Sequence, residues 1–149
     1  MGEPQPAAPD PLTISHTLMK KIIHTENAPA PIGPYNQAVQ AGGTLYVSGQ
    51  IALHPETGAL VTDSIEAETT QVMENLRAVL QAAGADFSQV AKASIFVKDM
   101  GQFARINEVY GQYFEPETAP ARETVEVANL PKYVNVEISV IAVLSNRTE

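Results

Sequence analysis

An arginine within a strand-like segment is the first residue that points to chemistry. Arg122 lies in the segment 120–127, Pro-Ala-Arg-Glu-Thr-Val-Glu-Val, where a strand would pack against apolar neighbours. A guanidinium stays protonated at physiological pH and presents a planar fork of donors that matches a carboxylate. Three interpretations are open: an exposed edge-strand arginine, a structural ion pair, or a site for a ligand carboxylate.

A glutamate in the last apolar run is the second candidate. Within residues 134–144 the even-numbered positions are all apolar, whereas the odd-numbered positions, including Glu137, are only half apolar. Glu137 is therefore expected beside buried surface, where a carboxylate must be paired, hydrogen-bonded or protonated. Tyr35 and Asn107 complete the set of polar candidates. Each has a structural alternative: Tyr35 as a packing ring, Asn107 as a solvated helix residue and Glu137 as a partner of Arg122.

Other chemistries lack their usual residues. The chain contains no cysteine, and His16, His24 and His54 show no metal-ligand spacing. Ser48 lacks the preceding glycine of a nucleophile elbow, and no glycine-rich phosphate loop is present. We therefore predict no metal and no organic cofactor.

Charge and hydropathy limit the classes of partner that this chain is expected to bind. The formal net charge is −8, which opposes binding to nucleic acid or to anionic lipid and favours a small-molecule or protein partner. No apolar run is long enough for a membrane span, and the N-terminus lacks the pattern of a secretory signal. The prediction is a soluble, cytoplasmic protein.

The first half of the chain predicts three strands and a helix. Strands are expected over 20–25, 35–41 and 44–51, the last two joined by Gly42-Gly43 in a type I′ turn. Apolar residues at helical spacing predict a helix over 65–83, with Asp63 or Ser64 as N-cap and Gly84 as the stop.

The second half predicts a strand, a helix and two final strands. A strand over 90–98 is followed by a helix that Asp99 opens and that carries apolar residues from Phe103 to Phe114. Strands over 122–128 and 134–144 follow, joined by a turn around Pro131. The order β-β-β-α-β-α-β-β indicates an α+β fold whose helices cover one sheet face, leaving the other face for oligomerisation.

Composition divides the chain into two parts. Residues 1–19 contain four prolines and few apolar side chains, which predicts a flexible N-terminal extension. Residues 20–149 are of a size that suits a single domain.

Several separated motifs occur in an order that is specific to one family. They are Ala-Pro-Ile-Gly-Pro-Tyr-Asn-Gln-Ala-Val at 30–39, Val-Ser-Gly-Gln-Ile at 47–51, the segment 120–127, and Leu-Pro-Lys at 130–132 followed by Val-Glu-Ile at 136–138. From about Lys20 to Leu144 the chain resembles the Rid family (YjgF/RidA), the reactive-intermediate imine and enamine deaminases. The resemblance implies a chorismate-mutase-like (YjgF-like) subunit, a mixed β-sheet with two helices packed on one face. It also implies a homotrimer with an active site at each subunit interface.

The resemblance also implies roles for individual residues. The carboxylate-binding arginine of the family matches Arg122 and its water-orienting glutamate matches Glu137. Tyr35, Ser48 and Asn107 match positions that line the family's pocket, and Thr124 stands at a pocket position where some relatives have cysteine. The implied activity is that of a 2-iminobutanoate/2-iminopropanoate deaminase. Such an enzyme hydrolyses 2-imino and 2-enamino acids, such as 2-aminoacrylate, to 2-keto acids and ammonia without metal or cofactor.

Two departures from the family pattern and two rival functions stay open. Glu123 stands where a small residue is expected, and Ala119 stands where an aromatic residue is frequent. Because neighbouring strand residues alternate faces, Glu123 is expected to point away from the side that carries Arg122. The rivals are a non-catalytic trimer of the same fold, binding a small carboxylate or acting like a chaperone, and an endoribonuclease. The acidic charge and the lack of a basic-aromatic stripe oppose the ribonuclease.

Overall fold

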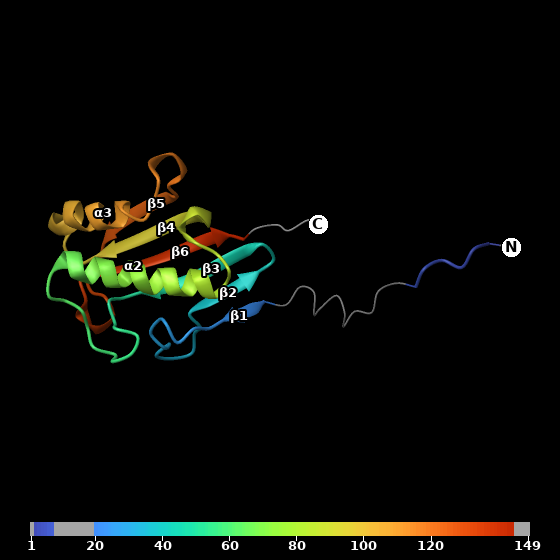
Figure 1. Cartoon of the computed structure of the whole chain (residues 1–149), viewed down its shortest axis with the longest axis horizontal. Coiled ribbons are helices and arrows are strands. Elements are labelled where there is room, and N and C mark those ends of the chain that lie inside the picture. Colours follow the sequence, from blue (N-terminus) through green and yellow to red (C-terminus); the bar gives the residue numbers. More distant parts are fainter. Residues whose placement is uncertain (1, 8–19, 145–149) are drawn as a thin grey trace.

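A mixed six-stranded sheet with two α-helices on one face forms the fold (Figure 1). The computed structural model describes residues 2–7 and 20–144, so most of the proposed N-terminal extension lies outside the described residues. The strands are β1 (Lys21–Ile23), β2 (Ala38–Ala41), β3 (Thr44–Gln50), β4 (Val90–Val97), β5 (Ala121–Glu126) and β6 (Val136–Val143), and the helices are α2 (Ile65–Ala82) and α3 (Phe103–Gly111). No helix within these residues is long and apolar enough to cross a membrane.

The predicted order of elements is confirmed, but their arrangement in the sheet is not sequential. The spatial order is β1-β2-β3-β6-β4-β5, in which β4 and β5 are parallel and all other neighbours are antiparallel. The last strand thus lies in the middle of the sheet, and β5 forms one edge. This arrangement is why β6 is alternately buried and half-exposed along nearly its whole length.

The hairpin between β2 and β3 has the expected two-residue loop but a different turn. A positive φ occurs at Gly42, at 59°, and not at Gly43, so the type I′ prediction is wrong. A positive φ at only the first central residue is typical of a type II′ turn. Both primed types match the twist of the strands, and a Gly-Gly pair can adopt either of them.

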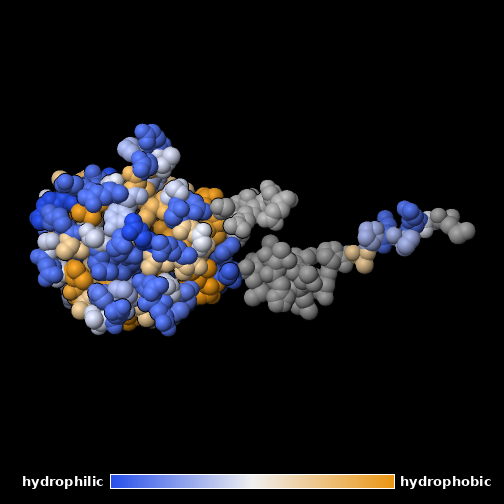
Figure 2. All heavy atoms as spheres, in the orientation of Figure 1, coloured by the Kyte–Doolittle hydropathy of each residue, from blue (hydrophilic) through white to orange (hydrophobic). Residues whose placement is uncertain are grey.

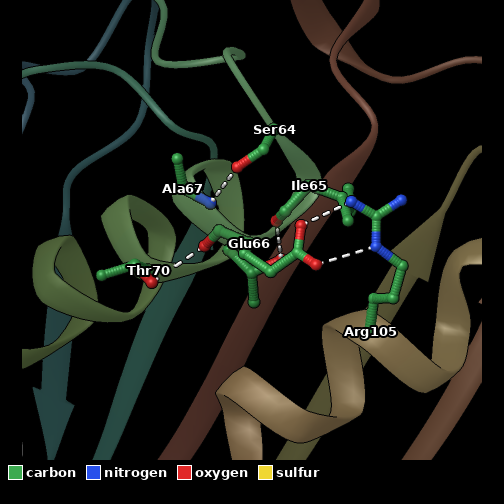
Figure 3. Close-up of polar contacts among 7 residues, drawn as sticks. Ser64, Ile65, Glu66, Ala67, Thr70 and Arg105 are labelled. Carbon is green, nitrogen blue, oxygen red and sulfur yellow. Dashed lines mark hydrogen bonds and ion pairs between the residues drawn. The ribbon is translucent and has the colours of Figure 1, made fainter.

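Helix α2 begins and ends close to the predicted residues. The Ser64 side chain accepts a hydrogen bond from the Ala67 N–H at 3.0 Å, which identifies Ser64 as the N-cap. Gly84, with a φ of 74°, lies just beyond the last turn. Figure 3 shows that Arg105 of α3 forms two hydrogen bonds, of 2.6 and 2.8 Å, with the Glu66 carboxylate in the first turn of α2. This pair joins the two helices at their exposed edges.

Helix α3 is shorter than predicted. Asp99 caps a single 3₁₀ turn, Met100–Gln102, by accepting a hydrogen bond from the Gly101 N–H at 2.8 Å, and α3 follows. The helix ends at Gly111, so Tyr113 and Phe114 lie beyond it. Both rings instead pack edge-on against Phe87, with ring centroids 5.2 and 5.4 Å away. Their helical spacing in the sequence therefore reflected burial rather than a continued helix.

The two faces of the sheet differ in what packs against them. Helix α2 packs on β3 and β6, and the buried side chains of these strands point toward it. In the view of Figures 1 and 2, hydrophilic residues predominate over the two helices. The opposite face of the sheet, which we call the open face, exposes apolar side chains: Ile22, Tyr46, Val125 and Val143.

Candidate active site

Glu137 points from the middle of the sheet into a cavity of about 280 Å³. The residues that line it come from the proline-rich loop between β1 and β2 (residues 24–37), the end of β3, the segment after β3, the turn before β6 and β6 itself: Pro29, Ala30, Ile32, Tyr35, Gln37, Gly49, Gln50, Ile51, Leu53, Pro131, Lys132 and Glu137. Most of this wall is apolar. Within the described residues the Glu137 carboxyl forms no hydrogen bond or ion pair, and burial raises its pKa.

The close approach of Glu137 to β3 requires a glycine. A Cβ atom at Gly49 would lie 2.9 Å from the Glu137 Cδ and 3.1 Å from its Oε1, closer than side-chain contacts permit. The pairing of β3 with β6 shifts register between Val47 and Gln50, which brings Gly49 beside the carboxyl. Gly49 thus makes room for the carboxyl in the cavity wall.

The proline-rich loop is anchored by a buried glutamine. The side chain of Gln37 is 2 % exposed; its Oε1 accepts from the Thr25 N–H at 2.8 Å. Its Nε2 donates to the carbonyls of Thr25, Ala28 and Pro29 at 2.9, 3.2 and 2.9 Å. Gln37 therefore fixes one wall of the cavity and has no spare donor for a ligand.

The cavity includes the predicted site residue Tyr35 of the proline-rich loop but not Ser48 of β3. Tyr35 lines it and is half-exposed, and its hydroxyl accepts a hydrogen bond from the Ile32 N–H at 3.3 Å. Ser48 is not among the lining residues, and its hydroxyl donates to the Asn36 carbonyl at 2.6 Å. In a single copy Ser48 therefore holds the loop that carries Tyr35.

Lys132 is the cation of this cavity. The residue has a φ of 54°, and Tyr133 beside it has a φ of 57°, so two consecutive non-glycine residues adopt the left-handed conformation. Such strained positions cluster at functional sites. The strain is visible only in the folded backbone, which explains why spacing alone did not single out Lys132.

Arg122 lies in a separate group of residues between β5 and α3. Its Nη1 donates to the Asn107 Oδ1 at 2.6 Å, and its Cζ lies 5.0 Å from the ring centre of Tyr110 and 5.4 Å from that of Phe103. The guanidinium is exposed and forms no ion pair within the described residues. It is therefore held by neutral groups and keeps its charge available for an anion.

The group of residues around Arg122 also contains two buried hydroxyls. The Tyr110 hydroxyl and the Thr124 Oγ1 are buried and have no hydrogen-bond partner among the described residues. Burial raises the pKa of Tyr110, and the positive charge of Arg122 partly offsets that effect. Thr124, two residues after Arg122 on the same strand, faces the same side as Arg122.

Glu123 points away from Arg122, as predicted from strand alternation. Its carboxylate accepts a hydrogen bond from Ser94 and pairs with Lys92 at 3.0 Å, both on the neighbouring strand β4. The hydrogen bond from Ser94, together with Lys92, lowers the pKa of Glu123. The Glu123 carboxylate thus has its partners on the open face of the sheet. The other departure from the family pattern, Ala119, is exposed and lines none of the described cavities.

Arg122 and Glu137 do not meet within one copy. Their strands follow one another in the chain, but β4 lies between β5 and β6 in the sheet. Arg122 is in register with Ala93 and Val140, which face the helices, whereas Glu137 is in register with Phe96 and Val125 on the open face. The two side chains therefore leave opposite faces of the sheet, so Glu137 is not the structural partner of Arg122 within one copy.

Comparisons with known proteins agree on one family. The family model described as "Endoribonuclease L-PSP" matches residues 25–144. A RutC family protein of Synechocystis sp. is 54% identical over 128 residues, covering 85% of this chain and 98% of the relative. The chain belongs to the Rid (YjgF) family.

Further Rid relatives extend the match to named enzymes and solved structures. The mouse protein named 2-iminobutanoate/2-iminopropanoate deaminase is 45% identical over 127 residues, covering 85% of this chain and 93% of that protein. A crystal structure of a Rid family protein from Yersinia pestis superposes with a TM-score of 0.82 at 46% identity, covering 85% of this chain and all of that one. The YjgF-like α+β fold implied by the resemblance is thereby confirmed.

Proposed function

We propose that this Rid protein hydrolyses 2-imino acids and their 2-enamino tautomers, such as 2-iminopropanoate and 2-aminoacrylate, to 2-keto acids and ammonia. The observation that supports this proposal best is Glu137, a half-buried carboxyl of raised pKa in a mostly apolar cavity. A raised pKa makes a carboxylate a stronger base, so that it takes a proton from water more readily and can still return it. The name of the mouse relative supports the same reaction class.

We infer that the complete site forms between two copies in a homotrimer. Arg122 and Glu137 leave opposite faces of one sheet, so one substrate can contact both only if they come from different copies. The exposed apolar residues of the open face support such an assembly, because an isolated subunit would leave them in water.

In the proposed reaction, Arg122 of one copy binds the substrate carboxylate and Glu137 of the next copy acts on water. A charge-assisted hydrogen bond of this kind contributes about 1.5–3 kcal/mol, enough to orient the substrate. Glu137 takes a proton from water while the water oxygen bonds to the imine carbon, the C=N π electrons move to nitrogen, and Glu137 returns the proton to that nitrogen to give a neutral carbinolamine. Glu137 then takes the proton of the carbinolamine hydroxyl as the carbonyl of the 2-keto acid forms and passes it to the nitrogen, so that the C–N bond breaks and ammonia leaves.

The first test is release of 2-keto acid from 2-aminoacrylate generated in situ by a PLP-dependent serine dehydratase. We expect the wild type to accelerate release and Arg122→Ala to lose most of that acceleration. Arg122→Lys should also be impaired, because a point charge does not reproduce the bidentate fork. No acceleration by the wild type would instead support the non-catalytic carboxylate-binding protein.

A mixing experiment tests the shared site. Arg122→Ala and Glu137→Gln are each expected to be inactive, but trimers reassembled from an equal mixture should contain intact Arg122–Glu137 pairs at about a quarter of their interfaces. Recovery of activity only in the mixture is the expected result. A mixture as inactive as its components would contradict a site built from two copies.

The family model's description keeps ribonuclease activity as the second candidate. The net charge of −8 opposes it, since RNA binding depends on cationic contacts to phosphates. RNA cleavage that weakens with salt and is lost in Arg122→Ala would revive this candidate.

The cytoplasmic location stays a prediction, which fractionation of the source cells can test.

A further inference from the structure

Helix α2 contains two polar side chains that are fully buried and bonded outside the helix. Glu68 is 0 % exposed and Asn75 is 1 % exposed. They are seven residues apart, two helical turns, and therefore lie on the same face of α2. A buried carboxylate is costly unless hydrogen bonds satisfy it, so its partners indicate what it does.

Glu68 holds the residues that lead into Glu137. Its Oε2 accepts hydrogen bonds from the main-chain N–H groups of Asn135 and Val136 at 2.7 and 3.2 Å, and its Oε1 accepts from the Asn135 Nδ2 at 2.8 Å. The Asn135 carbonyl in turn accepts from the Lys98 N–H at 3.0 Å. The peptide groups immediately before Glu137 are thus fixed from both sides.

Asn75 holds another part of the wall of the same cavity. Its Nδ2 donates to the carbonyls of Ile51 and Leu53 at 3.1 and 2.9 Å, and its Oδ1 accepts from the Gln71 Nε2 at 2.9 Å. Ile51 and Leu53 both line the Glu137 cavity. Because this segment follows the end of β3, Asn75 supplies donors to these carbonyls that the sheet does not.

We propose that Glu68 and Asn75 are positioning residues that act from the helix side of the sheet, Glu68 on the catalytic carboxyl of Glu137 and Asn75 on the substrate-facing wall. The proposal rests on the function proposed above. Two effects are expected to separate, because Glu68 holds the main chain that leads into Glu137, whereas Asn75 holds residues of the cavity wall. Loss of Glu68 should therefore lower kcat, and loss of Asn75 should raise KM.

The main test compares kcat and KM for imine hydrolysis in three variants. Glu68→Met removes the acceptors and is expected to lower kcat about tenfold with KM nearly unchanged, since small displacements of a reacting group are costly. Glu68→Gln should restore most of kcat, because one amide oxygen can still accept from both main-chain N–H groups and the Asn135 amide can rotate. Asn75→Leu should raise KM by a similar factor with kcat nearly unchanged.

Thr69→Val is the matched control. Thr69 is also fully buried on α2, but its hydroxyl bonds only to the Ile65 carbonyl within the helix, at 2.7 Å. We expect the variant to lose stability without a change in kcat or KM. If the Glu68 and Asn75 variants change both constants no more than this control, the positioning roles are wrong.

A second readout does not depend on activity. NMR can follow the titration of the Glu137 carboxyl carbon in the wild type and in Glu68→Met. In the variant the start of β6 should loosen and admit water, which should return the pKa of Glu137 toward its ordinary value. An unchanged titration in the folded variant would overturn the role of Glu68, whereas an inactive wild type with a shifted titration would overturn only the proposed function. Should Glu68→Met not fold, Asn135→Ala removes one of the three hydrogen bonds and should lower kcat about threefold; an unchanged kcat there would also overturn the role.

Discussion

At the scale of single residues, the chemistry of Glu137 depends on its surroundings more than on its type. The carboxyl lies in a mostly apolar cavity, beside a glycine that leaves space for it, and burial raises its pKa. By contrast, Glu123 is exposed on the same face of the sheet, and its contacts with Ser94 and Lys92 lower its pKa. The pKa values of two glutamates on one face of the sheet are thus shifted in opposite directions, and the proposed function assigns proton transfer to the one whose pKa is raised.

Glu137→Gln is expected to reduce turnover and to stabilise the fold at neutral pH. Loss of positioned proton transfer should lower kcat about 10²–10⁴-fold. Because the pKa is raised in the folded state, the folded protein binds the proton more tightly than the unfolded chain, and wild-type stability falls as pH rises through the raised pKa. Thermal unfolding should show the variant gaining stability over the wild type at about pH 7 and not at about pH 4. The exposed Glu108→Gln is the control, and equal profiles for both variants would contradict a buried Glu137.

The same raised pKa predicts the pH dependence of the reaction. If Glu137 must be ionised to take a proton from water, kcat/KM should rise with pH and level off only above the ordinary range of a glutamate. A profile that is already flat from the ordinary glutamate range upward would argue against this role. The measurement requires an imine supply whose own pH dependence is determined separately.

Gly49→Ala should impair the site more than its size suggests. The added methyl would lie 2.9 Å from the Glu137 Cδ, so either the carboxyl or the backbone must move. We expect a kcat at least about tenfold lower and a stability loss of about 1–3 kcal/mol. Gly43→Ala is the matched control, because a Cβ at Gly43 meets nothing within 4 Å. Similar kinetics for the two variants would show that the carboxyl adapts freely.

At the scale of elements, α2 connects parts of the site that lie on the other face of the sheet. Its buried Glu68 and Asn75 bond to the entry of β6 and to the segment after β3, while its first turn pairs with α3 through Glu66 and Arg105. The helix is therefore both the main packing element and the frame from which the Glu137 cavity is held. Its first turn depends on a single cap, Ser64.

Ser64→Ala should destabilise the protein by about 1 kcal/mol, because the Ala67 N–H loses its acceptor. The sequence left Asp63 and Ser64 as alternative caps, and the structure assigns the cap to Ser64. Asp63→Ala is thus the control and should change stability by no more than about 0.5 kcal/mol. Denaturant unfolding of both variants provides the measurement, and a larger effect at Asp63 would reverse the assignment.

At the scale of the whole molecule, the sheet separates the two halves of the proposed site. The helix side carries Arg122 with Asn107 and Tyr110, and the open face carries Glu137. A single copy holds both halves but cannot join them, so activity and assembly should be linked. The exposed apolar residues of the open face are the natural place for contact between copies.

Tyr46→Asp should disrupt assembly and activity together. Tyr46 is 51% exposed at the centre of a row formed with Ile22, Val39 and Ile141 across the open face. A charge buried at an apolar interface is strongly unfavourable, so we expect a folded species smaller than the trimer and without deaminase activity. Light scattering after gel filtration measures the mass, and Gln81→Glu, which adds the same charge on α2, is the control. A trimeric, active Tyr46→Asp would place the interface elsewhere.

The sequence by itself determined the elements, their order and the residue types of the site. Local signals were sufficient there: alternation in residues 134–144, the capped periodic run of α2 and the stop at Gly84 all depend on neighbours within a few residues. Residue type and strand alternation identified Arg122 and Glu137 as candidates, and the motif order then gave them expected roles. Alternation along a strand, which is a local property, also placed Glu123 correctly.

Only the tertiary structure decided how these pieces meet. The central position of β6, the parallel pairing of β4 with β5 and the opposite faces of Arg122 and Glu137 depend on contacts between residues far apart in the sequence. The end of α3 at Gly111 was decided by packing of Tyr113 and Phe114 on Phe87, which outweighed their helical spacing. In the sequence Glu68 and Asn75 are indistinguishable from ordinary polar residues of a helix, since their main-chain hydrogen-bond partners lie more than twenty residues away and come near only when the sheet has formed.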